Sequence, residues 1–256
     1  LACRQSPVLY VATAIAVTSM GKLCTFILAA LLLSACASTR TYSPVGNGEP
    51  APKKILLLPP EVRMQEISAG GIAETVEEWS KKANENLIAA LKQEVDAKQM
   101  FEIVEMPAVS EAEREIVDQH IAMYEVVATN AYQFGMLRDG SWTERARDLN
   151  YTIGPGLEFL AEETGADAAL FLVGLDMVST TGRRVMIFVT TLMFGLPVIP
   201  PGFSYVAAGL VDLHTGKLLW QSYDYGIGRL DLRELGDARS LTTSVLETYP
   251  GTEPKK

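Results

Sequence analysis

The segment Ala168-Ala169-Leu170-Phe171-Leu172-Val173-Gly174-Leu175 decides the fold. It is a short, uninterrupted apolar run, which predicts a strand buried on both faces. Gly165 lies just before it, in the position that ends a helix predicted over residues 157–164. A helix that leads directly into a buried strand is typical of α/β proteins.

The residues before this segment predict strands and helices in alternation. Pro59-Pro60 stop a first apolar run, because proline cannot donate to a sheet. Ser110 and Glu113 form a capping-box pattern that predicts the start of a helix. The predicted elements are a strand at 54–58, a loop at 63–71, a helix at 73–98 with a 3.6-residue apolar period, a strand at 101–106, a helix at 111–132 and a polar surface connection at 135–150.

The residues after it predict a β-meander. Its three strands are predicted at 185–191, 203–213 and 217–225, and Gly216 fits the turn between the last two. A short helix is predicted at 241–248. The fold class predicted is therefore α/β, with α+β as the alternative: a mixed sheet flanked by helices, with a C-terminal meander.

The start of the chain resembles a bacterial lipoprotein signal. Basic and apolar residues at 20–33 lead to Leu33-Ser34-Ala35-Cys36, which resembles the lipobox. The resemblance implies that Cys36 is acylated, with palmitate among its chains, and that residues 1–35 are removed. No Asp follows Cys36, which by the same resemblance implies the periplasmic face of the outer membrane in a Gram-negative bacterium. The alternative is an ordinary signal peptide with a chance cysteine.

The composition along the chain indicates four segments. We expect a leader and signal peptide at 1–35, with Met20 as the true start; a two-part apolar leader is the alternative. Residues 36–52, rich in Ser, Thr, Gly and Pro, predict a flexible tether. A single α/β domain is expected at 53–240, followed by a short helix and frayed tail at 241–256.

Charge and cysteine content exclude several classes of function. Residues 1–35 hold two of the 22 basic residues and no acidic one, so the remainder has 20 basic and 31 acidic residues, a formal charge of −11. Nucleic-acid binding needs a basic surface and is not expected. Removal of Cys3 and Cys24 with the leader would leave Cys36 alone, so we expect no disulfide and no cysteine metal site.

No residue pattern predicts catalysis, a metal or a cofactor. His120 and His214 lie far apart in sequence and neither belongs to a catalytic motif. We interpret both as surface residues. The acidic cluster of Glu74, Glu77 and Glu78 is better explained by the dipole of the following helix than by a metal site.

One polar segment and one apolar segment are candidate partner contacts. Arg183 and Arg184 could bind a carboxylate, or could simply be solvated charges in a turn. Residues 185–201 contain no charge, and Leu192, Phe194 and Leu196 are the contacts predicted there. The alternatives for this segment are a core strand, a loop that docks on a partner, a sister subunit or the membrane, and a pore-forming hairpin.

The lipobox, the strand at 55–60, the helix around 86–91, the stretch 165–170 and the strand-turn-strand at 210–220 together resemble one class of protein. They are similar to the α/β domain of outer-membrane lipoproteins such as the curli secretion lipoprotein CsgG and the synthase activator LpoB, and to the N-terminal domain of TolB. The resemblance covers residues 53–225 and implies a non-catalytic binding or assembly module of the envelope, with a protein partner or self-association. An envelope hydrolase and a subunit of an oligomeric secretion channel are the alternatives.

Overall fold

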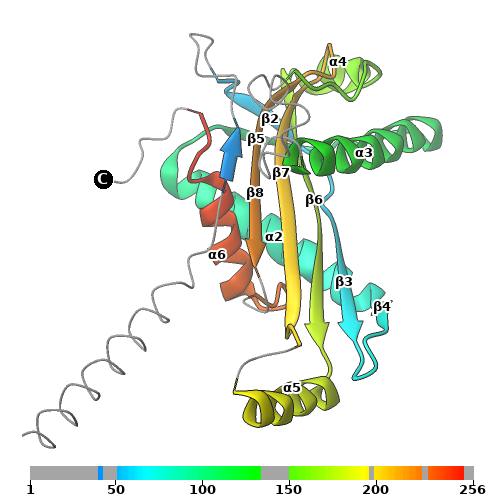
Figure 1. The fold of residues 1–256 in the computed structure, drawn as a ribbon. Helices are drawn as coiled ribbons and strands as arrows, with labels where there is room; N and C mark the ends of the chain where they lie inside the picture. Colours follow the sequence, from blue (N-terminus) through cyan, green and yellow to red (C-terminus); the bar gives the residue numbers. More distant parts are fainter. Residues whose placement is uncertain (1–39, 43–50, 134–149, 196–198, 227–229, 251–256) are drawn as a thin grey trace, which may run out of the picture. The chain divides into compact units, whose positions relative to one another are not determined.

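The protein is described from a computed structural model that covers residues 40–42, 51–133, 150–195, 199–226 and 230–250. The chain divides into two compact units, Leu1–Ala37 and Ser38–Lys256, and every described residue belongs to the second. That unit is a mixed sheet with helices on both faces (Figure 1), which confirms the predicted α/β class.

Strand β6 organises the sheet. It pairs antiparallel with β7 on one side and parallel with both β2 and β3 on the other. Two strands share one edge of β6 because Pro59 and Pro60 interrupt the ladder between them. The sheet order is β1-β8-β7-β6-β2-β5, with β3 on β6 and β4 on β3. The strands are β1 Arg40–Tyr42, β2 Lys54–Leu57, β3 Glu61–Ile67, β4 Ala73–Thr75, β5 Glu102–Glu105, β6 Ala168–Ser179, β7 Gly202–Asp212 and β8 Leu218–Gly226.

The C-terminal meander is present, but its first strand is not the predicted one. Strands β6, β7 and β8 form it, each antiparallel to the next. Residues 185–191, predicted as a strand, instead lie in helix α5, Thr181–Phe194. The prediction was wrong. The β-branched residues of this run favour a strand, but the length of the run and the signals at its ends favour a helix.

Four other elements differ from the prediction. The loop expected at 63–71 is largely strand β3, which turns back into β4. Helix α2, Glu77–Lys98, begins four residues late, and α6, Leu235–Leu246, begins before residue 241. Arg40–Tyr42, within the predicted tether, pair with β8. The connection predicted at 135–150 lies almost wholly outside the described residues.

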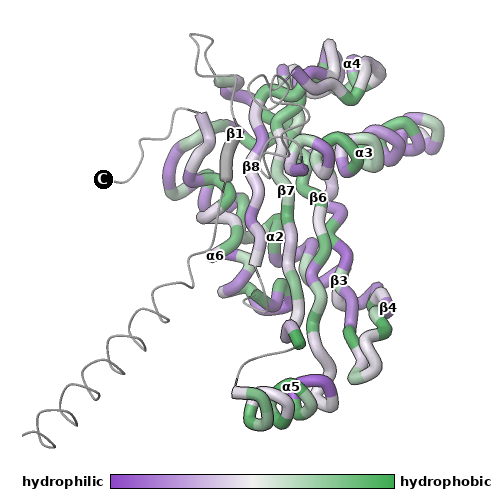
Figure 2. The backbone as a smooth tube through the Cα atoms, in the orientation of Figure 1, coloured by the Kyte–Doolittle hydropathy of each residue, from purple (hydrophilic) through white to green (hydrophobic). Residues whose placement is uncertain are grey.

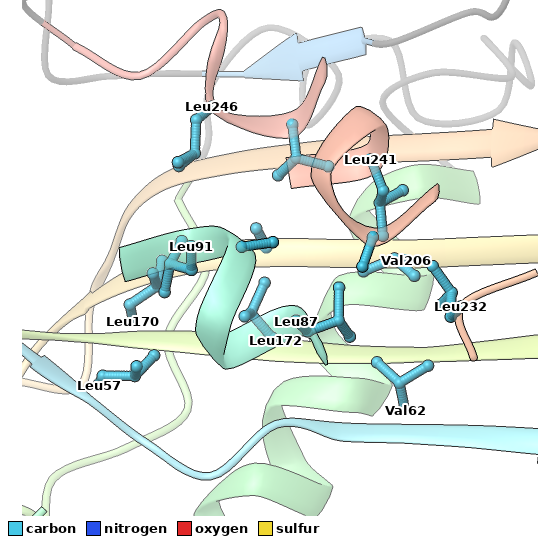
Figure 3. Packing of buried hydrophobic residues seen from close by; sticks show 14 of the residues in the cluster. Leu57, Val62, Leu87, Leu91, Leu170, Leu172, Val206, Leu232, Leu241 and Leu246 are labelled. Atoms are coloured by element: carbon cyan, nitrogen blue, oxygen red, sulfur yellow. The ribbon is translucent and has the colours of Figure 1, made fainter. Parts of the chain in front are cut away.

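Helices cover both faces of the sheet and create two buried clusters. On one face α2 and α6 pack on the sheet, and Figure 3 shows side chains of the cluster between them, among them Leu87, Leu91, Leu170, Leu172 and Leu241. On the other face lie α3, Glu111–Ala131, and α4, Glu158–Thr164. The capping box at Ser110 and the left-handed Gly165 are both confirmed.

One glycine is required for the packing of α3. The ring of Tyr124, fully buried in the second cluster, lies directly over Gly209 of β7. A Cβ atom at residue 209 would overlap the Tyr124 hydroxyl. The largest side chain of α3 therefore reaches the sheet only because β7 has no side chain at that point.

Candidate functional site

Helix α5 carries six of the ten large apolar residues that are exposed among the described residues. It connects β6 to β7 at one end of the sheet (Figure 1), and Figure 2 shows it as mostly hydrophobic. Its exposed apolar residues recur at helical spacing, so most of them lie along one face. These side chains are between 46 and 72 % exposed: Val185, Phe188, Val189, Leu192, Met193 and Phe194.

Both ends of the helix are capped by the residues that flank it. The Thr180 hydroxyl accepts a hydrogen bond from the Arg183 amide at 3.2 Å, and Gly195 ends the helix in the left-handed conformation. The hydroxyls of Thr190 and Thr191 donate back to helix carbonyls, at 2.9 Å to Met186 and 2.7 Å to Ile187. Its polar groups are thus largely satisfied within the helix itself.

Arg183 fixes α5 to the end of the sheet. It is the buried residue of the helix, and its guanidinium donates to the Ser68 carbonyl at 3.4 Å and the Pro200 carbonyl at 3.2 Å. These two carbonyls belong to the β3–β4 turn and to the segment before β7. One side chain therefore joins the helix to both neighbouring connections.

The predicted contact residues separate into three groups. Leu192, Phe194 and Arg184 are exposed on α5, whereas Arg183 points inward, so the two arginines do not form one exposed pair. Leu196 lies outside the described residues, as do Cys36 and the lipobox residues Leu33, Ser34 and Ala35.

Neither histidine has the surroundings of a catalytic base. The His120 ring nitrogens lie 2.7 Å from the Ile116 carbonyl and 3.2 Å from the Pro155 carbonyl, which holds the loop at Gly156 against α3. His214 lies in the β7–β8 turn, where the carboxylate of Asp212 accepts its amide hydrogen at 3.0 Å. The His120 ring thus joins α3 to the loop, whereas the hydrogen bond of His214 comes from its backbone amide.

A polar cavity of about 360 Å³ lies between the start of β3 and the first turns of α2. Glu61, Arg63, Glu77 and Lys81 are among its lining residues, and neither histidine is. Asn84 and Ser80, also in its wall, accept hydrogen bonds from the amides of Val62 and Met64. Two polar side chains of the cavity wall therefore join α2 to β3. Within the described ranges, no group of three or more His, Cys, Asp or Glu side chains could hold a metal ion.

A buried carboxylate that was not predicted as a site residue lies in β6. Asp176 of β6 is fully buried; it accepts from the Ser204 hydroxyl at 2.6 Å and from the Leu232 amide at 3.0 Å. Burial raises the pKa of this carboxyl, against the lowering effect of these two hydrogen bonds. Asp176 thus fixes residues 230–233 to the sheet. The signal that could have identified it is a single acidic residue inside an apolar strand.

The same segment is also fixed to α2. The Asn86 amide donates to the carbonyls of Leu232, at 3.0 Å, and Arg233, at 2.8 Å. The Arg233 guanidinium lies 4.0 Å from the ring centroid of Trp79, within cation–π range. This network is thus structural, and α5 remains the candidate site.

Sequence comparisons assign no family. No protein-family model matches the chain, and no curated protein matches it. Structural similarity is found to a PelC dodecamer from Paraburkholderia phytofirmans (TM-score 0.36, 14% identity, 82% of this chain and 95% of that one). It is also found to lipoprotein GNA1162 from Neisseria meningitidis (TM-score 0.28, 17% identity, 68% and 79%). At these TM-scores and identities, the similarities establish neither a family nor a function for this chain.

Proposed function

We propose that the protein is a lipid-anchored module of the bacterial cell envelope that acts by binding, not by catalysis, and that α5 is its contact element. The carrying observation is the row of exposed apolar side chains on α5. Contiguous apolar surface of this kind is typical of interaction sites on otherwise soluble domains. Leu192, Phe194, Leu196 and Arg184 are the contact residues proposed, with Arg183 positioning the helix.

The anchor is proposed to be Cys36, acylated at the periplasmic face of the outer membrane. The order of residues from Leu33 to Cys36 supports it, as does the basic and apolar sequence before them. Several acyl chains on one residue hold a protein stably at a membrane, whereas a single chain binds only marginally.

The hydrolase alternative has less support. It predicts a pocket that contains a histidine beside a serine or a carboxylate. The polar cavity between β3 and α2 is lined by neither histidine, and two polar side chains of its wall join α2 to β3. A binding role requires no such pocket.

The anchor is tested by cell fractionation and by the mass of the mature N-terminus. The wild-type protein should sediment with outer membranes and carry acyl chains on Cys36, whereas Cys36→Ser should lack them and leave that fraction. A Cys36→Ser variant that still sediments with outer membranes would contradict the anchor.

The contact role of α5 is tested by a photo-crosslinking residue placed at 192 in cells. The matched control is position 126 on α3, where Val126 is also exposed, at 59 %. We expect adducts at 192, whether with lipid or with protein, in large excess over those at 126. Equal yields at the two positions would contradict the assignment of α5.

A further inference from the structure

We infer that α5 lies in the surface of the same bilayer that holds the acylated Cys36, so that the protein has a second, non-covalent membrane contact. This inference rests on the proposed function, because it takes the anchor at Cys36 as given. The apolar face of α5 is thus covered by lipid and not by a second protein.

The direction of β1 is the first argument. Strand β8 runs toward the end of the sheet where α5 connects β6 to β7, since Gly226 pairs with Ser204. Strand β1 is antiparallel to β8, with Arg40 opposite Tyr223. Arg40, the first residue of β1, therefore lies at the end of that strand nearer to α5.

Chain length is the second argument. Three residues lie between Cys36 and Arg40, and the four Cα–Cα steps that join them limit their separation to about 14 Å. Arg40 is in register with Tyr223 and, through it, with Ala207, which is five residues from the start of β7. Five strand residues span about 17 Å. An acylated Cys36 thus keeps the bilayer surface within reach of the α5 end of the sheet.

The chemistry of α5 is the third argument. Every side chain from Val185 to Phe194 is apolar or a threonine, and both threonine hydroxyls donate back to helix carbonyls. A helix can face hydrocarbon only if its polar groups are satisfied internally. A protein-binding face, by contrast, usually carries a polar rim that its partner must match.

The neighbouring turn extends the same surface. Ile72 is 64 % exposed and lies in the β3–β4 turn, whose Ser68 carbonyl accepts a hydrogen bond from Arg183 of α5. The one exposed charge of α5 is Arg184, near its first turn, and a cation there suits anionic or zwitterionic headgroups.

The length of α5 determines how it lies. Fourteen helical residues measure about 21 Å, whereas a bilayer core is about 30 Å thick. Among the described residues, no helix is long and apolar enough to cross a membrane. We therefore place α5 in the headgroup and upper acyl region, where apolar helices bind without spanning.

The test uses the acylated full protein in phosphatidylethanolamine–phosphatidylglycerol vesicles, with one cysteine added for an environment-sensitive fluorophore. Leu192→Cys reports on α5 and Val126→Cys on α3, and the parent protein gives the background labelling. We expect the label at 192 to lose most of its fluorescence to nitroxides on lipid chains. The label at 126 should respond only to quenchers in water.

Two results would overturn the inference. One is equal accessibility of both labels to aqueous quenchers. The other is a label at 192 shielded from both kinds of quencher, with energy transfer between copies, which would mean that a second copy covers α5. Failure of the anchor is separate, because it would appear as missing acyl mass on Cys36 and loss of the protein from the vesicles.

Discussion

Helices α2 and α5 bury and expose opposite kinds of side chain. The residues that α2 buries are mostly small and aliphatic, among them Ala83, Leu87, Leu91 and Val95, and glutamate and lysine occupy its exposed face. The residue that α5 buries is Arg183, and its exposed face is apolar. Burial of aliphatic side chains explains why α2 forms part of the core. The same physics gives no stabilising role to the exposed side chains of α5, which is why we assign them to contact.

The largest difference in stability is expected between alanine variants of two leucines, Leu87 of α2 and Leu192 of α5. Leu87→Ala removes a side chain buried between α2 and the sheet, and should lower the free energy of unfolding by about 2–5 kcal/mol. Leu192→Ala removes one that is 69 % exposed, and should change it by no more than about 0.5 kcal/mol. Urea unfolding of the two variants measures the difference. Equal losses would mean that Leu192 belongs to the core.

The next contrast uses adjacent arginines of α5. Arg183→Ala removes the side chain that joins the helix to the Ser68 and Pro200 carbonyls and leaves both without this donor, so a loss of about 1–3 kcal/mol is expected. Arg184→Ala, at an exposed position, should cost no more than about 0.5 kcal/mol. Thermal unfolding of both variants makes the comparison, and a larger loss at Arg184 would contradict the positioning role of Arg183.

A smaller contrast is expected from the helix caps. Ser110→Ala removes the capping box of α3, which packs on the sheet, and should lower stability by about 1 kcal/mol. Thr180→Ala removes the cap of α5 and should act locally, with faster amide exchange in α5 and little change in global unfolding. If Thr180→Ala lowered global stability as much as Ser110→Ala, α5 would be part of the cooperative core.

The smallest change concerns Asp176, in the network that joins β6 to the segment packed on α2. Because burial raises the pKa of this carboxyl in the folded protein, its contribution to stability is complete below the unfolded value of 3.8 and is lost as pH rises through the folded-state pKa. Asp176→Asn does not titrate, so its stability relative to wild type should increase over that pH range. A difference between the two proteins that is constant with pH would contradict this.

The sequence predicts an element correctly where its propensity, its apolar period and its end residues all favour the structure that burial also favours. The strand at 54–58, the helix that ends at Lys98, the capping box at Ser110 and the turn at Gly216 are examples. At each of these, propensity, period and end signals favour one structure.

The contact helix was missed for a physical reason. Without charges, residues 185–194 have no polar face to reveal a helical period, and their β-branched residues favour a strand. The decisive signals were Thr180 and Gly195 at the two ends. That the apolar face is exposed could not be predicted, because it depends on where β6 and β7 end. The inward direction of Arg183 depends on the turn at Ser68, more than a hundred residues earlier.

Amide hydrogen exchange on the acylated protein tests the central claim most directly. The wild type on vesicles, at less than one chain per vesicle so that a second copy cannot contribute, is compared with Cys36→Ser in buffer. We expect exchange in α5 to slow on the vesicles while exchange in α2 stays the same. Exchange in α5 that is equally fast in both states would contradict it.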